Sequence, residues 1–213
     1  PGVSKAYNEG AELAKFLDKK FLFILDQDTI LPINFPSSYQ SSVTLFPNYP
    51  LYAPQVYSGN LLFSPCRYIF RKGSNFSSIK PGKHKLLYKN VLNSGLLVDL
   101  DAFRTVDGYD ENVKLYFSDF IFFDRLKKYY KYFVVLDCRL DHQLSSVDYS
   151  NIEIAIKRFS YYCTGARQAS RHNLLAFINQ FVVIGIRSLL MSYRFKSFKF
   201  FFIYKEFFLG FTG

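Results

Sequence analysis

The sequence predicts an α/β fold that is followed by a helical extension rich in basic and aromatic residues. Two observations support this prediction. Near the N-terminus a helix-like pattern leads directly into a short apolar strand, and the last third of the chain combines apolar runs with cationic residues. A chain of 213 residues fits one domain with an appendage. We expect the domain to cover residues 1–146 and the helical extension to cover residues 147–213.

The first predicted elements are a surface helix from Ser4 to Lys20 and a strand that begins at Phe21. The strand opens the sequence FLFILDQDTI, in which five apolar residues are followed by Asp26 and Asp28. We expect this strand to be buried, so that both aspartates lie at its carboxyl end. Ligands collect at the carboxyl ends of strands in open α/β sheets, where two carboxylates could hold a cation or a ribose. A polar loop with two solvated acids is the alternative.

A second group of polar residues follows later in the chain. Asn93, Ser94 and Gly95 interrupt an apolar strand, and glycine within a strand marks a bulge or a close approach of the backbone. Asp119 then marks the start of a helix, where a carboxylate meets exposed N–H groups. A further strand leads to His142. Each of these residues also has a plain structural interpretation, as a strand bulge, a helix-end carboxylate or a solvated histidine.

Positive charge is concentrated at the C-terminal end of the chain. The whole chain carries a net charge of +10, and residues 151–213 hold nine basic residues against Glu153 and Glu206. Lysines alternate with aromatic residues in YRFKSFKFFFIYKEFF. This pattern favours a peripheral contact with an anionic membrane surface, and we expect no nucleic-acid partner because RNP-like aromatic strands are missing from the sequence. The three scattered cysteines favour a reducing compartment.

The most apolar window runs from Leu174 to Met191. Asn179, Gln180 and Arg187 interrupt it, and its length barely matches a bilayer. We expect a helix that lies in the membrane interface. A buried core helix and a helix that crosses the membrane are the alternatives.

Several segments, taken in order, resemble the family 2 glycosyltransferases of the GT-A fold, especially their rhamnosyltransferase-like branch. They are GVSKAYNEGAELA, LDQDT, NSGLLVD, DGYDE, a helix with Asp119 and Arg125, and His142. The resemblance covers roughly residues 2 to 144. It implies a GT-A-like mixed sheet flanked by helices, from which the family's first strand and base pocket are missing at the N-terminal side. Ser118 stands where the family usually has an acidic residue.

The resemblance also implies roles for individual residues. Asp119 would be the general base, and Asp28, with His142 as a further candidate ligand, would bind Mn²⁺ or Mg²⁺. The expected donor-binding residues are Asp26, Gln27, Asn93, Ser94, Gly95 and Arg125. The implied activity is that of an inverting hexosyltransferase, with rhamnose as one possible sugar. It would use a dTDP- or UDP-sugar and a glycan or lipid-linked acceptor in cell-surface polysaccharide synthesis, at the cytoplasmic face of a bacterial membrane.

Two other functions compete with this interpretation. Haloacid-dehalogenase-like phosphatases also place a DxD motif after an apolar strand, but they have Thr or Val two residues after the second Asp, where this chain has Ile30. A phosphatase would also leave the NSG and DGYDE segments unexplained. The third possibility is a non-catalytic module that binds membranes or polyanions through its basic and aromatic tail.

Overall fold

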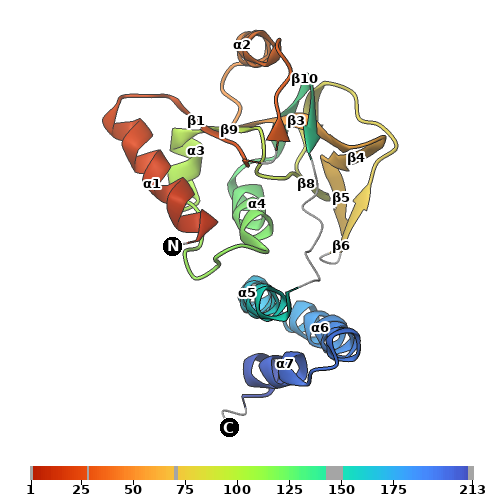
Figure 1. The fold of residues 1–213 in the computed structure, drawn as a ribbon. Helices are drawn as coiled ribbons and strands as arrows, with labels where there is room; N and C mark the ends of the chain where they lie inside the picture. Colours follow the sequence, from red (N-terminus) through yellow and green to blue (C-terminus); the bar gives the residue numbers. More distant parts are fainter. Residues whose placement is uncertain (1, 28, 70–71, 143–150, 211–213) are drawn as a thin grey trace. The chain divides into compact units, whose positions relative to one another are not determined.

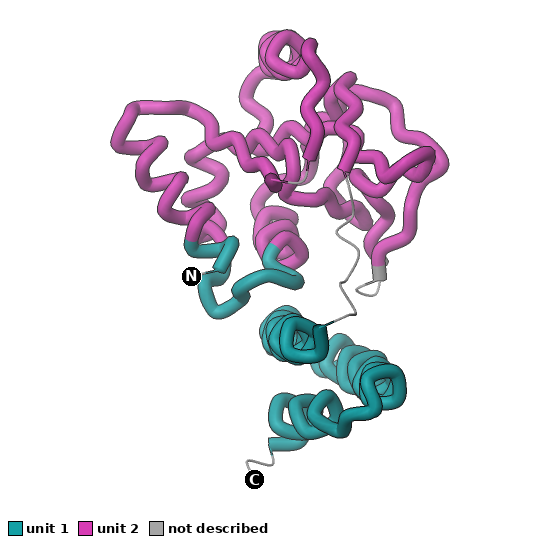
Figure 2. The backbone as a smooth tube through the Cα atoms, viewed as in Figure 1, with its two compact units in different colours: residues 1–5, 110–118, 146–213 teal, residues 6–109, 119–145 magenta. Residues whose placement is uncertain are grey.

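The computed structural model describes residues 2–27, 29–69, 72–142 and 151–210 (Figure 1). In this part of the chain seven helices accompany a seven-stranded mixed sheet and a three-stranded sheet, which confirms the predicted α/β class with a mixed sheet flanked by helices. The chain forms two compact units (Figure 2). We call residues 6–109 and 119–145 the sheet unit, and residues 1–5, 110–118 and 146–213 the helical unit.

The larger sheet of the sheet unit has the strand order β1-β9-β3-β10-β2, with β4 paired to β3 and β7 paired to β10. Strands β3 and β10 run parallel, and the other pairs of this sheet run antiparallel. Strands β6, β5 and β8 form the smaller, antiparallel sheet. The strands are β1 (Phe21–Ile24), β2 (Thr29–Ile30), β3 (Leu51–Ser58), β4 (Leu61–Ser64), β5 (Cys66–Ile69), β6 (Lys72–Asn75), β7 (Gly82–Lys85), β8 (Lys89–Asn90), β9 (Leu96–Asp99) and β10 (Tyr132–His142).

Helices cover both faces of the larger sheet. They are α1 (Val3–Phe16), α2 (Phe35–Leu45), α3 (Leu100–Thr105) and α4 (Ser118–Tyr129). Side chains alternate between the two faces along a strand, so Phe133 and Val135 of β10 join one core cluster whereas Val134 and Leu136 join the other. The first cluster contains residues of α1, α3 and α4, and the second contains Tyr39 of α2.

The first strand is less buried than the sequence predicts. Strand β1 stands at the end of the strand order and pairs with β9. Ile24 is buried, but the side chain of Phe23 is 37% exposed. The ring of Phe23 packs on two rings of α2, at 5.9 Å from Phe35 and 5.4 Å from Tyr39. The expectation of a buried strand is therefore wrong, because β1 lies at the end of the strand order and the rings of α2 cover Phe23 only in part. Leu22 and Ile24 of the same strand pack into the core cluster on the opposite face.

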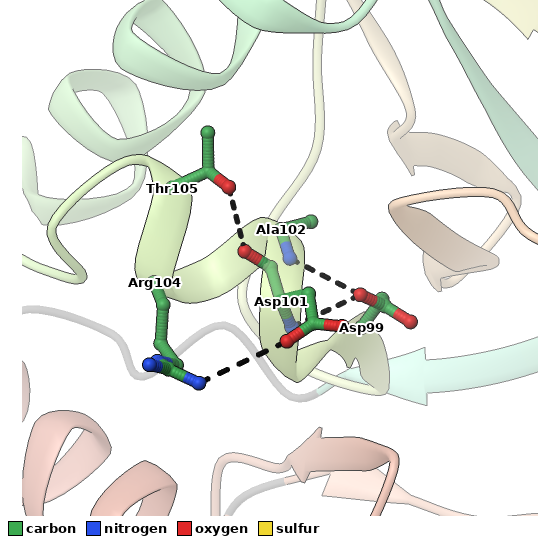
Figure 3. A network of polar contacts seen from close by, with 5 residues as sticks. All are labelled: Asp99, Asp101, Ala102, Arg104 and Thr105. Carbon is green, nitrogen blue, oxygen red and sulfur yellow. Dashed lines mark hydrogen bonds and ion pairs between the residues drawn. The ribbon is translucent and has the colours of Figure 1, made fainter.

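A polar cap joins β9 to α3 (Figure 3). One carboxylate oxygen of Asp99 accepts hydrogen bonds from the backbone N–H groups of Asp101 and Ala102, at 3.0 and 3.1 Å. Arg104 lies 3.9 Å from the Asp101 carboxylate, and the Thr105 hydroxyl donates to the Asp101 carbonyl. The two bonds to Asp99 satisfy N–H groups that a helix leaves free in its first turn. The cap fixes the turn that follows β9.

Three long helices form most of the helical unit: α5 (Ile152–Ser170), α6 (Leu174–Phe195) and α7 (Lys199–Leu209). The predicted helical extension is confirmed. Residues 110–118 belong to the same unit, where the side-chain amide of Gln168 donates to the Asp110 carboxylate over 2.6 Å. Within the described residues, α6 is the one helix that is long and apolar enough to cross a membrane, and only 22% of its apolar window is buried.

Candidate functional site

Four of the residues predicted for the site lie at the same end of the strands of the larger sheet, and a fifth, Asp119, lies within reach of the charge of Asp26. Asp26 follows β1, Asn93 and Ser94 precede β9, Asp119 lies in the first turn of α4, and His142 ends β10. All five belong to the sheet unit. They come from four separate parts of the chain, so the fold alone brings them together.

A chain of hydrogen bonds connects Asp26 with His142. The backbone N–H of Asp26 donates to the Ser94 hydroxyl over 3.3 Å. The hydroxyl oxygens of Ser94 and Thr29 lie 2.5 Å apart, and the Thr29 hydroxyl lies 2.9 Å from Nδ1 of His142. Strand β2 makes this possible, because its antiparallel pairing with β10 sets Thr29 opposite His142. Thr29 thus links Ser94, which is bonded to Asp26, with His142.

Two tyrosines complete the cluster. The hydroxyl of Tyr7, on α1, donates to a carboxylate oxygen of Asp26 over 3.1 Å. Its ring lies 5.0 Å from the ring of Tyr109, whose hydroxyl donates to the side-chain oxygen of Asn93 over 2.7 Å. Burial, followed by the negative charge of Asp26, raises the pKa of Tyr7 far above its ordinary value. Tyr7 therefore stays protonated at neutral pH and remains a hydrogen-bond donor.

A reciprocal pair of hydrogen bonds holds the two tyrosine-bearing segments together. The side-chain amide of Asn8 donates to the Tyr109 carbonyl, and its oxygen accepts from the Tyr109 N–H, both over 2.9 Å. Gly108 precedes Tyr109 with φ of +55°, and a Cβ at this glycine would lie 2.6 Å from the Asn8 side-chain oxygen. Only glycine leaves room for this pairing. Asn8 thereby fixes the place of Tyr7 beside Tyr109.

Asp119 is a partly buried carboxylate that lies close enough to Tyr7 and Tyr109 for its charge to raise the pKa of each. Burial raises its pKa from the ordinary value of 3.8 to about 6, although the N–H groups of Phe120 and of Asp119 itself oppose the shift, and the charge of Asp26 adds to it. The Phe120 N–H donates to Asp119 over 2.8 Å. Such a carboxylate is mostly ionised at pH 7 and is a stronger base than a solvated aspartate.

The glycine of the NSG segment has a packing role in the structure. Gly95 adopts φ of +75°, and a Cβ there would collide with the side chains of Leu140 and Pro54. The hydroxyl of Tyr39 donates to the Gly95 carbonyl over 2.5 Å. These neighbours explain the need for glycine. A contact between Gly95 and a donor stays a prediction.

The remaining two predicted donor residues lie differently. Gln27 is exposed directly after Asp26. The guanidinium of Arg125 donates to the carbonyls of the turn after α3, with distances of 3.3 Å to Gly108 and 3.5 Å to Val106 and Asp107. The structure therefore gives Arg125 a role in holding the turn that precedes Tyr109. Its role toward a diphosphate, like that of Gln27, stays a prediction.

The predicted metal ligands are only partly visible. Asp28 lies outside the described residues, and His142 has Thr29 as a neighbour of Nδ1. Among the residues that the structure describes, no group of three or more His, Cys, Asp or Glu side chains could hold a metal ion. The carboxylate of Asp26 offers oxygen ligands, which Mg²⁺ and Mn²⁺ prefer. The metal set stays a prediction.

Sequence reasoning missed three members of the cluster, namely Tyr7, Thr29 and Tyr109. Each lies inside a segment that the sequence singles out: Tyr7 in GVSKAYNEG, Thr29 directly after LDQD, and Tyr109 in DGYDE. Their hydroxyl groups, placed within or next to these motifs, could have identified them as hydrogen-bonding partners of the site. No model of a protein family matches this chain, and no curated protein matches it.

Proposed function

We propose that the protein is an inverting glycosyltransferase, a hexosyltransferase that moves a sugar from a nucleoside-diphosphate donor to a hydroxyl group of an acceptor. One observation carries the proposal: a carboxylate whose pKa is raised to about 6, Asp119, adjoins a hydrogen-bonded cluster around a second carboxylate, Asp26. Two carboxylates whose surroundings separate their properties commonly divide the work of a reaction. In this proposal Asp119 acts as the base and Asp26 binds the donor.

Asp119 is the general base in this proposal. The acceptor hydroxyl must lose a proton as it attacks the anomeric carbon of the donor sugar. A carboxylate with pKa about 6 accepts this proton more readily than a solvated one and is still ionised at pH 7. A base on the side opposite the leaving diphosphate implies a single displacement, in which the bond from the anomeric carbon to the diphosphate breaks as the new glycosidic bond forms. The configuration is inverted.

The polar groups around Asp26 suit the donor. A carboxylate accepts hydrogen bonds from the hydroxyls of a ribose or a sugar, and the hydroxyls of Ser94 and Tyr7 hold Asp26 in place. A divalent ion, Mn²⁺ or Mg²⁺, would neutralise negative charge on the leaving diphosphate when bound. As the resemblance implies, Asp28 and His142 would supply its ligands.

The wider setting belongs to the same proposal. The donor is a dTDP- or UDP-sugar, with rhamnose as one candidate, and the acceptor is a glycan or a lipid-linked glycan. A lipid-linked acceptor agrees with the cationic C-terminal third of the chain, because basic residues favour the anionic cytoplasmic face of a membrane. The process served is cell-surface polysaccharide assembly.

Titration calorimetry and a transfer assay test the proposal together. UDP and dTDP are titrated with and without Mn²⁺, and release of nucleoside diphosphate from a panel of nucleotide sugars is then measured. We expect metal-dependent binding of one nucleotide. Asp119→Asn should bind it normally but turn over roughly 10²- to 10⁴-fold more slowly, the usual contribution of a general base.

Asp101→Asn is the matched control, because Asp101 also lies in the first turn of a helix but its side chain is 92% exposed. It should leave both binding and turnover unchanged. The proposal fails if neither nucleotide binds the wild-type protein. Hydrolysis of simple phosphate monoesters by that same protein would then favour the phosphatase.

A further inference from the structure

Helix α6 presents a wide apolar face to solvent. Nine apolar side chains on it are at least 44% exposed: Leu174, Leu175, Ile178, Val182, Val183, Ile186, Leu189, Leu190 and Tyr193. At 3.6 residues per turn they cover roughly half of the helix circumference over about 30 Å. Exposed apolar patches of more than a few hundred Å² mark sites of interaction. This face therefore needs a partner.

The opposite side of α6 is already occupied. Ala176, Gln180, Ile184, Ser188 and Ser192 recur every four residues and are buried, and α6 packs against both α5 and α7. The phenol ring of Tyr204, on α7, lies against Gly185, where a Cβ would come within 3.0 Å of the hydroxyl. The face described above, which also includes the exposed side chain of Asn179, is left open to a further partner.

Cations line one border of that face. Arg187 and Arg194 are exposed and seven residues apart, so they lie on nearly the same side of the helix. The guanidinium of Arg187 stacks over the ring of Tyr162, on α5, at 4.5 Å from its centroid. This stacking holds the charge at the border and away from the apolar side chains.

We propose that α6 binds an anionic lipid surface, lying in the plane of the membrane with its apolar face among the acyl chains and its arginines at the headgroups. An apolar half bordered by arginines is the pattern of such helices. The excess of basic over acidic residues in residues 151–213 gives the complementary charge. The proposal is independent of the catalytic one, because this surface requires no nucleotide sugar.

Two other partners for the apolar face of α6, the interior of a bilayer that the helix crosses and a second copy of the chain, fit less well. A bilayer crossing would place Arg187 inside the hydrocarbon, since it lies within the apolar stretch of α6, and intramembrane arginines are strongly disfavoured. A second copy of the chain would bring two equally cationic units together, and like charges repel. A lipid surface has neither difficulty.

Vesicle binding of the full chain, without nucleotide, tests the proposal. The probes are phosphatidylcholine vesicles with and without phosphatidylglycerol. We expect binding that requires phosphatidylglycerol and weakens as salt is raised. Leu189→Glu should weaken it roughly tenfold or more, because complete burial of one such side chain is worth at least that factor. Leu87→Glu is the matched control, since Leu87 is 58% exposed in the sheet unit and Leu189 is 57% exposed.

A fluorescent variant keeps the test decisive if Leu189→Glu does not fold. The chain contains no Trp, so Tyr193→Trp introduces a single reporter on the apolar face. Its emission should shift to shorter wavelength when phosphatidylglycerol vesicles are added. Absence of vesicle binding, or equal weakening by both glutamate variants, overturns the proposal. A concentration-dependent dimer that Leu189→Glu dissociates, without vesicle binding, would assign the face to a second copy instead.

Discussion

Replacing Asp119 by Asn should stabilise the protein at neutral pH while it abolishes most of the activity. The carboxylate has a pKa of about 6 in the folded chain against an ordinary value of 3.8. Because one pKa unit corresponds to about 1.4 kcal/mol, the ionised form lowers the free energy of unfolding by up to about 3 kcal/mol. Asn is neutral, and its side-chain oxygen still accepts the hydrogen bond from the Phe120 N–H.

The pH dependence gives the sign of the effect. Unfolded chains release the Asp119 proton near pH 3.8, whereas the folded chain holds it until about pH 6. The wild-type free energy of unfolding therefore falls as pH rises between these values, and the full loss is present above pH 6. Asp119→Asn should be more stable than wild type at pH 7.5, by as much as about 3 kcal/mol. At pH 4 and below the two proteins should be almost equally stable.

Urea denaturation of both proteins at a series of pH values measures this difference. The transfer assay on wild type should show a rate that rises with pH through an apparent pKa near 6, the value at which Asp119 loses its proton. Asp101→Asn again serves as the control and should show neither effect, because its carboxylate is exposed. A variant that is less stable than wild type at pH 7.5, or equally changed at every pH, would refute the argument from burial.

Three further substitutions probe the cluster and its support. Tyr7→Phe removes a hydrogen bond to a charged group, so nucleotide binding measured by calorimetry should weaken roughly tenfold, since such bonds contribute about 1.5–3 kcal/mol. Gly95→Ala should lower the free energy of unfolding by well over 2 kcal/mol, because its Cβ would collide with packed side chains at φ of +75°. Asp99→Ala should lower it by about 1 kcal/mol through loss of the α3 cap.

Gly95→Ala has a matched control. Gly59→Ala has a similar φ of +60° but open space around the new Cβ, so it should lower the free energy of unfolding by only about 1–2 kcal/mol. An equal effect at Gly59 and Gly95 would mean that the packing around Gly95 is unimportant. Unchanged nucleotide binding by Tyr7→Phe would remove Tyr7 from the site. A stable Asp99→Ala protein would show that water replaces the cap.

Local patterns predicted the elements that carry the site, but not how completely each is enclosed. The helix before Phe21 and the helix start at Ser118 follow from spacing and capping residues, and both are present. Composition does not distinguish a central strand from one at the end of the strand order, where side chains are covered less completely, as in β1. The side chain of Phe23 shows the difference, because the rings of α2 shield only part of it.

Contacts between residues far apart in the sequence also limit how much of the site the sequence predicts. Asn8 is bonded to Tyr109 across 101 residues, and no local pattern indicates which residue an asparagine will meet at that separation. The same holds for Tyr7 and its hydrogen bond to Asp26, which depends on how α1 lies against the end of β1. Its spacing from Asp119 predicts a role for Arg125 at the donor, yet the guanidinium donates to carbonyls of the turn after α3. Spacing locates a side chain along a helix but not the group that it reaches.

The hydrogen-bond chain from Asp26 to His142 also bears on the order in which the protein folds. Its three links join residues separated by 68, 65 and 113 positions, so each closes a long loop before it contributes any stability. Helices of the C-terminal third depend on contacts close in sequence, which form faster. During synthesis the chain of bonds cannot be complete until His142 has emerged, although Asp26 was made long before. Binding competence should therefore appear in the last kinetic phase of refolding, after most of the helical signal has returned.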